Sequence, residues 1–418
     1  MAELWVLTAV GAGILLLGFA ARLAFDRWRI PDFLVLLLAG MAVGPAGANL
    51  IVPDVRASIE VVAPLMLVVA VAFIMFEAGL QVQRLRGTGG GALIVVHTLV
   101  AGGLTFVGAL LVLERAFGLS QVSAAVLAAA VLGPSALVVA SFAGRLNLDP
   151  RTKRALVVEG VLANVVAFFV VMSLPNFSRS SSAEAAVIAS VGGLFFAVVA
   201  ALGVGLVWGV AIQHLHAREG VMFATLAIAL GIYALASGLL GGNGAVAVFA
   251  FGAMLGRLGI FGAPIPDSAG AEPKGAEHSR FHAEMTFFVR TFFFFYLGLL
   301  FDPATLSWLA AAMCAALVIL FFIARLPSAW LLSMAWRLPR KDTIVLSGSV
   351  SRGLSDTVLV LFAIQQGIVP ASEGVLLASA IFLLLIVTVV ATAIIVLVAE
   401  RTGAGAQAAP AAPEGEAG

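Results

Sequence analysis

Apolar stretches of about 20 residues follow one another along almost the whole chain, with short polar breaks between them. A helix of roughly 20 apolar residues crosses about 30 Å of hydrocarbon and satisfies its own backbone polar groups there. Hydrophobic residues make up 62% of the sequence and charged residues only 11%, against about 45–50% and about 25% in soluble domains. The sequence therefore predicts an all-α integral membrane protein that lies in a lipid bilayer.

We predict about thirteen transmembrane helices, of which the eighth and ninth could merge. Residues 1–400 then form a single transmembrane unit. Residues 401–418 are of low complexity and cannot build a core, so they are predicted to be a disordered cytoplasmic tail. The predicted spans are about 3–25, 31–51, 58–82, 90–113, 120–144, 154–175, 184–212, 220–240, 243–258, 283–301, 305–335, 342–366 and 373–399.

Basic residues give the expected orientation, because cytoplasmic loops collect Lys and Arg. Most of the 23 Lys and Arg residues fall on the predicted inner side, and only Arg56, Arg115 and Arg179 fall on the outer side. This asymmetry predicts a multi-pass protein of a cell-type (inner) membrane with its N-terminus outside and its C-terminus in the cytoplasm. The net charge of +1 gives no sign of a nucleic-acid partner.

Several chemistries find no support in the sequence. The segment GGNGAV, residues 241–246, lacks the Lys and Ser/Thr of a phosphate-binding loop. We identify no nucleophile with a neighbouring base, and the single cysteine, Cys314, lies in an apolar run. We therefore expect no enzyme activity, no cofactor and no resident metal.

Ionisable residues inside the spans are the main functional candidates, because a charge in the middle of a bilayer is costly unless it is used or paired. Counting about 1.5 Å per helical residue from the basic inner anchors places Asn164 and Arg352 both about 15–16 Å deep. The candidates are Glu77, His97, Glu159, Arg290, Arg325, Arg352 and Asp356.

Two spans carry helix-breaking residues at this depth. Gly133 and Pro134, followed by Ser135, interrupt the span 120–144, and Gly348 and Gly353 flank Arg352 in the span 342–366. Interrupted helices expose unpaired backbone groups in the membrane centre, where these groups can line an ion site. Paired breaks are typical of inverted-repeat transporters.

Five segments resemble the monovalent cation:proton antiporter superfamily, the sodium/proton exchangers, in order and spacing. They are RIPDFLVLLLAGMAVGP (29–45), FEAGLQVQ (76–83), GPSALVVASFAGRLNLDPRTKRALVVEGVLANVV (133–166), HAEMTFFVRTFFFFYLGLLFD (282–302) and VSRGLSDTVLVLFAIQQG (350–367). The resemblance implies an inverted-repeat fold with two broken, crossed helices in a core of about 90–175 and 305–399. It also implies a homodimer that forms through the remaining scaffold helices.

The sequence departs from the family pattern at one important position. The family's sixth helix has a Glu and, five residues later, an Asp that binds cation and proton alternately. Here Glu159 matches the Glu, but Asn164 stands at the Asp position. An amide offers an oxygen to a cation but cannot release a proton near neutral pH. Arg352 matches the Arg of the family's RGL stretch, and Arg290 lies where the tenth helix commonly has a basic residue.

Another carboxylate would then carry the proton, or proton coupling is lost. Asp356 and Glu159 are the two choices, and Asp356 comes first, although a local pair of Asp356 with Arg352, four residues earlier, is an equal alternative. Glu159 is expected to pair with Arg290, because their depths overlap. Glu77 either lines an inner funnel or is a paired carboxylate.

The sequence thus predicts a secondary transporter that exchanges Na⁺ or K⁺ for H⁺ by alternating access. The first alternative is an uncoupled or channel-like carrier, or a transporter of an anionic or organic substrate drawn to Arg290 and Arg352. The second alternative is a non-transporting membrane sensor built on an antiporter scaffold.

Overall fold

The structure is a computed structural model, and the structural description is confined to the residues it places. These are residues 4–28, 32–44, 47–48, 53–82, 91–135, 138–139, 146, 148–215, 220–239, 243–259, 276–301 and 303–407. Within them the chain is helical, without a β-strand. The helices are α1 (Leu4–Trp28), α2 (Asp32–Val43), α3 (Pro53–Gln81), α4 (Gly91–Arg115), α5 (Gln121–Ala130), α7 (Pro150–Arg179), α8 (Ala183–Leu215), α9 (Val221–Leu239), α10 (Gly244–Arg257), α11 (Ala276–Leu300), the 3₁₀ helix η2 (Pro303–Thr305), α12 (Trp308–Trp336), α13 (Arg340–Gly348), α14 (Leu354–Gln365) and α15 (Ala371–Gln407).

Each predicted span overlaps a helix, or in one case the two helices α13 and α14, among the described residues, with bounds that differ by several residues. The eighth and ninth spans are separate, because α9 ends at Leu239 and α10 begins at Gly244. The far half of the span 120–144 lies largely outside the described residues. One boundary is wrong: residues 401–407 of the predicted tail continue α15. Adding residues to an existing helix is far less costly than starting one, so a long apolar helix extends into an Ala-containing segment. Residues 408–418 lie outside the described residues.

Several helices begin at residues that favour a helix start. Ser120 caps α5 and its side chain accepts a hydrogen bond from the backbone N–H of Ser123 at 3.3 Å. Asp149 caps α7 by accepting from Arg151 N at 2.7 Å, with Pro150 in the first helical position. Such caps satisfy backbone donors that the helix leaves unpaired. Local sequence therefore determines where these helices start.

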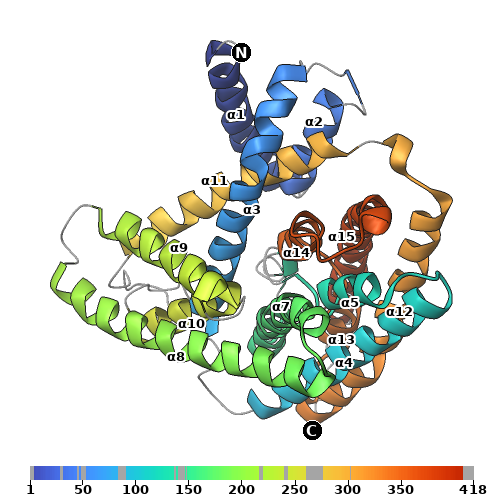
Figure 1. Ribbon diagram of the computed structural model, residues 1–418. Coiled ribbons are helices and arrows are strands. Elements are labelled where there is room, and N and C mark those ends of the chain that lie inside the picture. The colour runs from blue at the N-terminus through green and yellow to red at the C-terminus, as the bar shows by residue number, and fades with distance from the viewer. Residues whose placement is uncertain are drawn as a thin grey trace, which may run out of the picture.

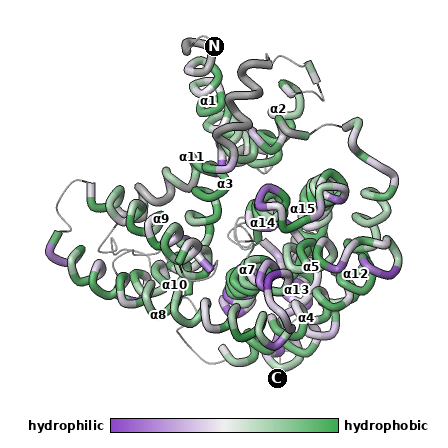
Figure 2. Tube along the Cα trace, in the orientation of Figure 1, coloured by the Kyte–Doolittle hydropathy of each residue, from purple (hydrophilic) through white to green (hydrophobic). Residues whose placement is uncertain are grey.

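Seven of the described helices are long and apolar enough, by length and composition, to cross a membrane. They are α4, α7, α8, α9, α12, residues Pro64–Gln81 of α3 and residues Ala371–Ala399 of α15. Figure 2 shows hydrophobic residues along most of the helical tube and hydrophilic residues largely near helix ends. Large apolar side chains such as Phe195, Phe196 and Val207 are exposed on α8, as expected for helices that face lipid.

The helices pack into two groups (Figure 1). One group, the broken-helix group, consists of α4, α5, α7 and α12 to α15, with close packing of α12 on α4 and α15. The other, the scaffold group, consists of α1 to α3 and α8 to α11, with α10 packed on α3 and α8 and with α11 packed on α2. The two groups meet where α3 contacts α7 and α14, and where α7 contacts α8 and α10.

Glycines allow close packing within the scaffold group. A Cβ atom at Gly40 of α2 would collide with the Phe295 carbonyl of α11, and one at Gly79 of α3 would collide with the Phe249 carbonyl of α10. Small residues let backbones approach closely, which stabilises helix pairs in lipid through packing and weak contacts. The α2–α11 and α3–α10 pairs are joined in this way.

Candidate functional site

The interruption after α5 meets the interruption between α13 and α14. Helix α5 ends at Ala130, and Gly133 and Pro134 follow in a non-helical segment. The backbone N–H of Ser135 donates to the carbonyl of Ser351 at 2.8 Å. Each break therefore provides a hydrogen-bond partner for a backbone group of the other break. Backbone polar groups in a membrane interior need such partners, because no water is there to bind them.

Glycine is required where the breaks touch their neighbours. At Gly353, which begins α14, a Cβ atom would collide with the hydroxyl of Ser135. At Gly133, a Cβ atom would collide with the Cβ of Ala163 on α7. The break after α5 thus packs directly against the Ala163-Asn164 pair.

Arg352 lies between the breaks and is 2% exposed. Its guanidinium donates to the carbonyl of Gly133 and lies 3.9 Å from the centre of the Phe321 ring. Its backbone N–H donates to Thr388 Oγ1 at 2.9 Å. A cation is favourable near the C-terminal end of a helix, where unpaired carbonyls give a partial negative charge. Arg352 therefore stabilises the end of α5.

Asp356 stabilises the other helix end at the break. Its Oδ2 accepts from the backbone N–H of Gly353 at 2.9 Å, and its Oδ1 accepts from Ser355 Oγ at 3.2 Å. A carboxylate in the first turn complements the partial positive charge of a helix start. Arg352 precedes α14, so it does not share a helix face with Asp356 as predicted, but the two opposite charges still interact.

Glu159 belongs to a buried charge cluster beside the breaks, and its backbone carbonyl lies next to Gly133. Arg325 of α12 binds both of its carboxylate oxygens, at 2.5 and 3.0 Å, and donates to the carbonyl of Leu346 at 2.9 Å. His97 Nε2 of α4 lies 3.4 Å from Glu159 Oε2. The expected pair of Glu159 with Arg290 is wrong. Arg290 is on α11, which packs against α1, α2 and α3, so its neighbours belong to the scaffold group.

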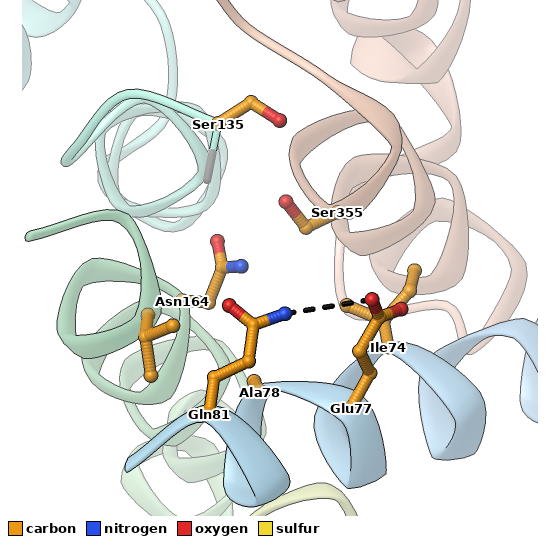
Figure 3. Close-up of a pocket in the computed structure, with 8 residues that line it drawn as sticks. Ile74, Glu77, Ala78, Gln81, Ser135, Asn164 and Ser355 are labelled. Carbon is orange, nitrogen blue, oxygen red and sulfur yellow. Dashed lines mark hydrogen bonds between the residues drawn. The ribbon is translucent and has the colours of Figure 1, made fainter. Parts of the chain in front are cut away.

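A pocket lies between α3 of the scaffold group and the two breaks. Figure 3 shows the Gln81 amide of α3 between the Asn164 amide and the Glu77 carboxylate, with the hydroxyls of Ser135 and Ser355 on the opposite side of the pocket. Gln81 Nε2 donates to Glu77 Oε1 at 3.4 Å. Ile74, Ala78 and Val161 complete the described lining. The lining therefore combines one carboxylate with amide and hydroxyl oxygens.

The structure brings some of the sequence candidates together and separates others. Glu77, Ser135 and Asn164 line the pocket, while Gly133, Pro134 and Arg352 belong to the adjoining breaks. Glu159, Asp356 and Arg290 are not among the lining residues.

The sequence did not point to two of the pocket residues, and it named Arg325 as a candidate without predicting its partner. Gln81 and Ser355 line the pocket, and Arg325 is the partner of Glu159. Gln81 lies one helical turn after Glu77, a spacing that puts two side chains on one face. That spacing is a signal available in the sequence. No comparable local signal distinguished Arg325 from Arg290 as the partner of Glu159.

A known protein family and two solved structures are similar to this chain. The model of a family described as "Sodium/hydrogen exchanger, transmembrane" matches residues 12–400. No curated protein sequence matches the chain.

Two solved structures of the sodium proton antiporter MjNhaP1 from Methanocaldococcus jannaschii are similar to the fold. One, determined at pH 8, has a TM-score of 0.73 at 18% identity, covering 97% of this chain and 99% of that one. The other, from an electron-microscopy map, has a TM-score of 0.68 at 17% identity, covering 99% and 100%. Similarity at this level of identity establishes a common fold.

Proposed function

The chain belongs to the sodium/hydrogen exchanger family, and on that premise we propose that it is a secondary transporter exchanging a monovalent cation, Na⁺ or K⁺, for H⁺ by alternating access. The observation that carries the proposal is the pocket that Glu77, Gln81 and Asn164 line together beside the two helix breaks. A carboxylate can hold either a proton or a cation, whereas amide and hydroxyl oxygens can replace part of a cation's water shell.

Glu77 is the residue to which we assign the proton in this mechanism. It is the one carboxylate among the described residues that line the pocket. When deprotonated it supplies the negative charge for the cation, and Asn164, Gln81, Ser135 and Ser355 supply neutral oxygens. When protonated it leaves no charge to hold the cation. Competition between proton and cation at one carboxylate couples the two fluxes.

Asp356, the first choice from sequence, is the weaker candidate for this role. Both of its oxygens accept hydrogen bonds within the first turn of α14, and it is absent from the described pocket lining. Arg352 is engaged by the Gly133 carbonyl and the Phe321 ring. This engagement argues against an anionic substrate held by Arg352.

The broader architecture of the proposal follows the two helix groups. We assign the moving core to the broken-helix group, with the two broken helices crossing as in an inverted repeat. We assign the homodimer contact to the scaffold group. The pocket's position between the groups supports this division, because movement of one group against the other would expose the pocket alternately. The full proposal has about thirteen spans, with the N-terminus outside and the C-terminus in the cytoplasm.

An uncoupled cation carrier is the second candidate. The observation that favours it is Asn164 itself, which lines the pocket but cannot exchange a proton. In this case the pocket would conduct the cation without moving H⁺. The non-transporting sensor requires that neither ion moves.

Proton flux in proteoliposomes separates these functions. In an acid-loaded vesicle, addition of Na⁺ or K⁺ outside should release internal protons, seen as dequenching of a pH-gradient dye. Glu77→Gln should abolish this signal while the protein still elutes as a folded species. Glu184→Gln, a change at an exposed acid in the first turn of α8, is the matched control and should exchange normally. Cation uptake without proton release would support the uncoupled carrier, and the absence of both fluxes would support the sensor.

A further inference from the structure

Two carboxylates outside the pocket each join the starts of two helices in the broken-helix group. Glu373 near the start of α15 accepts from the backbone N–H of Ser120 at 3.0 Å and from its hydroxyl at 2.7 Å. Asp342 near the start of α13 accepts from the backbone N–H of Asp149 at 2.8 Å. Ser120 and Asp149 are the residues that cap α5 and α7.

The Glu373–Ser120 and Asp342–Asp149 contacts have the same arrangement. Each joins the start of a helix that leads into a break with the start of an uninterrupted helix: α5 with α15, and α13 with α7. The joined residues are 253 and 193 positions apart in sequence. Asp342 is only 2% exposed, so its carboxylate is buried without a role in the pocket. Each contact therefore ties the far end of a half-helix to a neighbouring helix.

Local helix formation does not require these contacts. The Ser120 side chain already accepts from Ser123 N, and the Asp149 side chain already accepts from Arg151 N. A helix start carries further unpaired N–H groups and a partial positive charge, which favour an additional carboxylate. Because Glu373 and Asp342 come from other helices, they constrain how the helices lie relative to one another.

The contacts act on the pocket through rigid helices. Helix α5 extends about 15 Å from its start to the break that carries Ser135. Helix α7 extends about 22 Å from Asp149 to Asn164. Ser135 and Asn164 line the same pocket. Any tilt of α5 or α7 at its start therefore displaces a pocket oxygen relative to Glu77.

We propose that Glu373 and Asp342 are positioning residues of the cation pocket, acting from the starts of α5 and α7. They fix the positions of the Ser135 and Asn164 oxygens in the pocket lining, and they do so by accepting backbone hydrogen bonds. Their charge is secondary to this contact. The inference rests on the proposed function, because it assigns these residues to the same pocket.

Transport kinetics with conservative variants test the proposal. Glu373→Ala and Asp342→Ala should raise the apparent KM for Na⁺ about three- to tenfold, because small displacements of ligand groups weaken binding strongly. The kcat per folded molecule should change much less. Glu373→Gln and Asp342→Asn should remain close to the parent protein, since an amide oxygen still accepts the backbone N–H. Glu184→Ala, at an exposed acid on α8, serves as the control.

Unchanged KM values in both Ala variants would overturn the proposal, as would Gln and Asn variants as impaired as the Ala variants. Hydrogen–deuterium exchange gives a second readout that needs no transport. The Ala variants should accelerate exchange at the helix starts and also around residues 133–135 and 354–356. Acceleration confined to the helix starts would leave the contacts without a positioning role. If the parent protein moves no protons, the proposed function fails. The pattern of hydrogen–deuterium exchange still decides whether these carboxylates position the pocket.

Discussion

Arg325 of α12 binds both carboxylate oxygens of Glu159 of α7, at 2.5 and 3.0 Å, in a site where the two residues are 3% and 1% exposed. Arg325 also donates to the Leu346 carbonyl of α13. One guanidinium thereby joins three helices of the broken-helix group. The pair is buried in a low-dielectric interior, where either charge alone is costly.

Arg325→Met should therefore lower the free energy of unfolding by about 3–5 kcal/mol, because Glu159 keeps a buried charge without its main partner. Adding Glu159→Gln should recover part of this loss. Thermal unfolding of the purified protein in detergent measures both effects. Arg290→Met combined with Glu159→Gln is the matched control and should give additive changes. Additive changes for Arg325 and Glu159 would contradict the coupling.

Asp356→Asn should retain cation-dependent proton release. The Asn oxygen can still accept from the backbone N–H of Gly353, and the pocket keeps its carboxylate at Glu77. Asp356→Ala should instead lower stability by about 0.5–2 kcal/mol through loss of the helix cap. Dye dequenching and thermal unfolding check the two outcomes. A folded Asp356→Asn protein without exchange would return the proton-carrying role to Asp356.

Gly353→Ala should impair transport. The added Cβ would collide with the hydroxyl of Ser135 and push the two breaks apart where Ser135 N donates to Ser351 O. Forcing extra atoms into a packed site typically costs about 1–3 kcal/mol. Proton flux per folded molecule is the measurement. Gly103→Ala, in α4 with open space around its Cβ, is the control, and equal flux from both variants would show that the contact of the breaks is dispensable.

Asn164→Asp should lower the apparent KM for Na⁺. It places a second carboxylate in the pocket that Glu77 lines, and an added opposite charge attracts a cation strongly where water is scarce. The Na⁺ dependence of proton release measures this. Asn164→Ala should change KM in the opposite direction because it removes an oxygen ligand. An Asn164→Asp variant with unaltered Na⁺ dependence would remove Asn164 from the cation site.

Exchange by the parent protein should not depend on membrane potential. A single carboxylate among the described lining residues binds either one proton or one monovalent cation, so each turnover moves equal charge in both directions. Initial rates in proteoliposomes should stay constant when a potential is imposed with valinomycin and a K⁺ gradient, with Na⁺ as the exchanged cation. A rate that changes with the sign of the potential would require a second charged group in the transport step.

Hydropathy and helix-breaking residues determined much of the architecture. The apolar runs predicted the helix positions, and Gly133, Pro134 and Gly353 marked where two spans are interrupted. These properties are local: burial in lipid depends on a continuous apolar stretch, and proline or glycine alters the backbone at its own position. Asn164 was likewise recognised because it is a polar residue in an apolar span.

Tertiary structure alone decided which of these residues meet. Counting along a helix gives depth but neither its rotation nor its neighbours, so overlapping depth predicted Arg290 as the partner of Glu159, whereas the structure pairs Glu159 with Arg325. The same count paired Asp356 with Arg352, whereas the break put Arg352 on the Gly133 carbonyl and left Asp356 to cap α14. Glu77 became the pocket's carboxylate only because α3 packs against α7 and α14. Long-range packing sets these contacts, since a side chain's partner depends on which helix face is turned toward it.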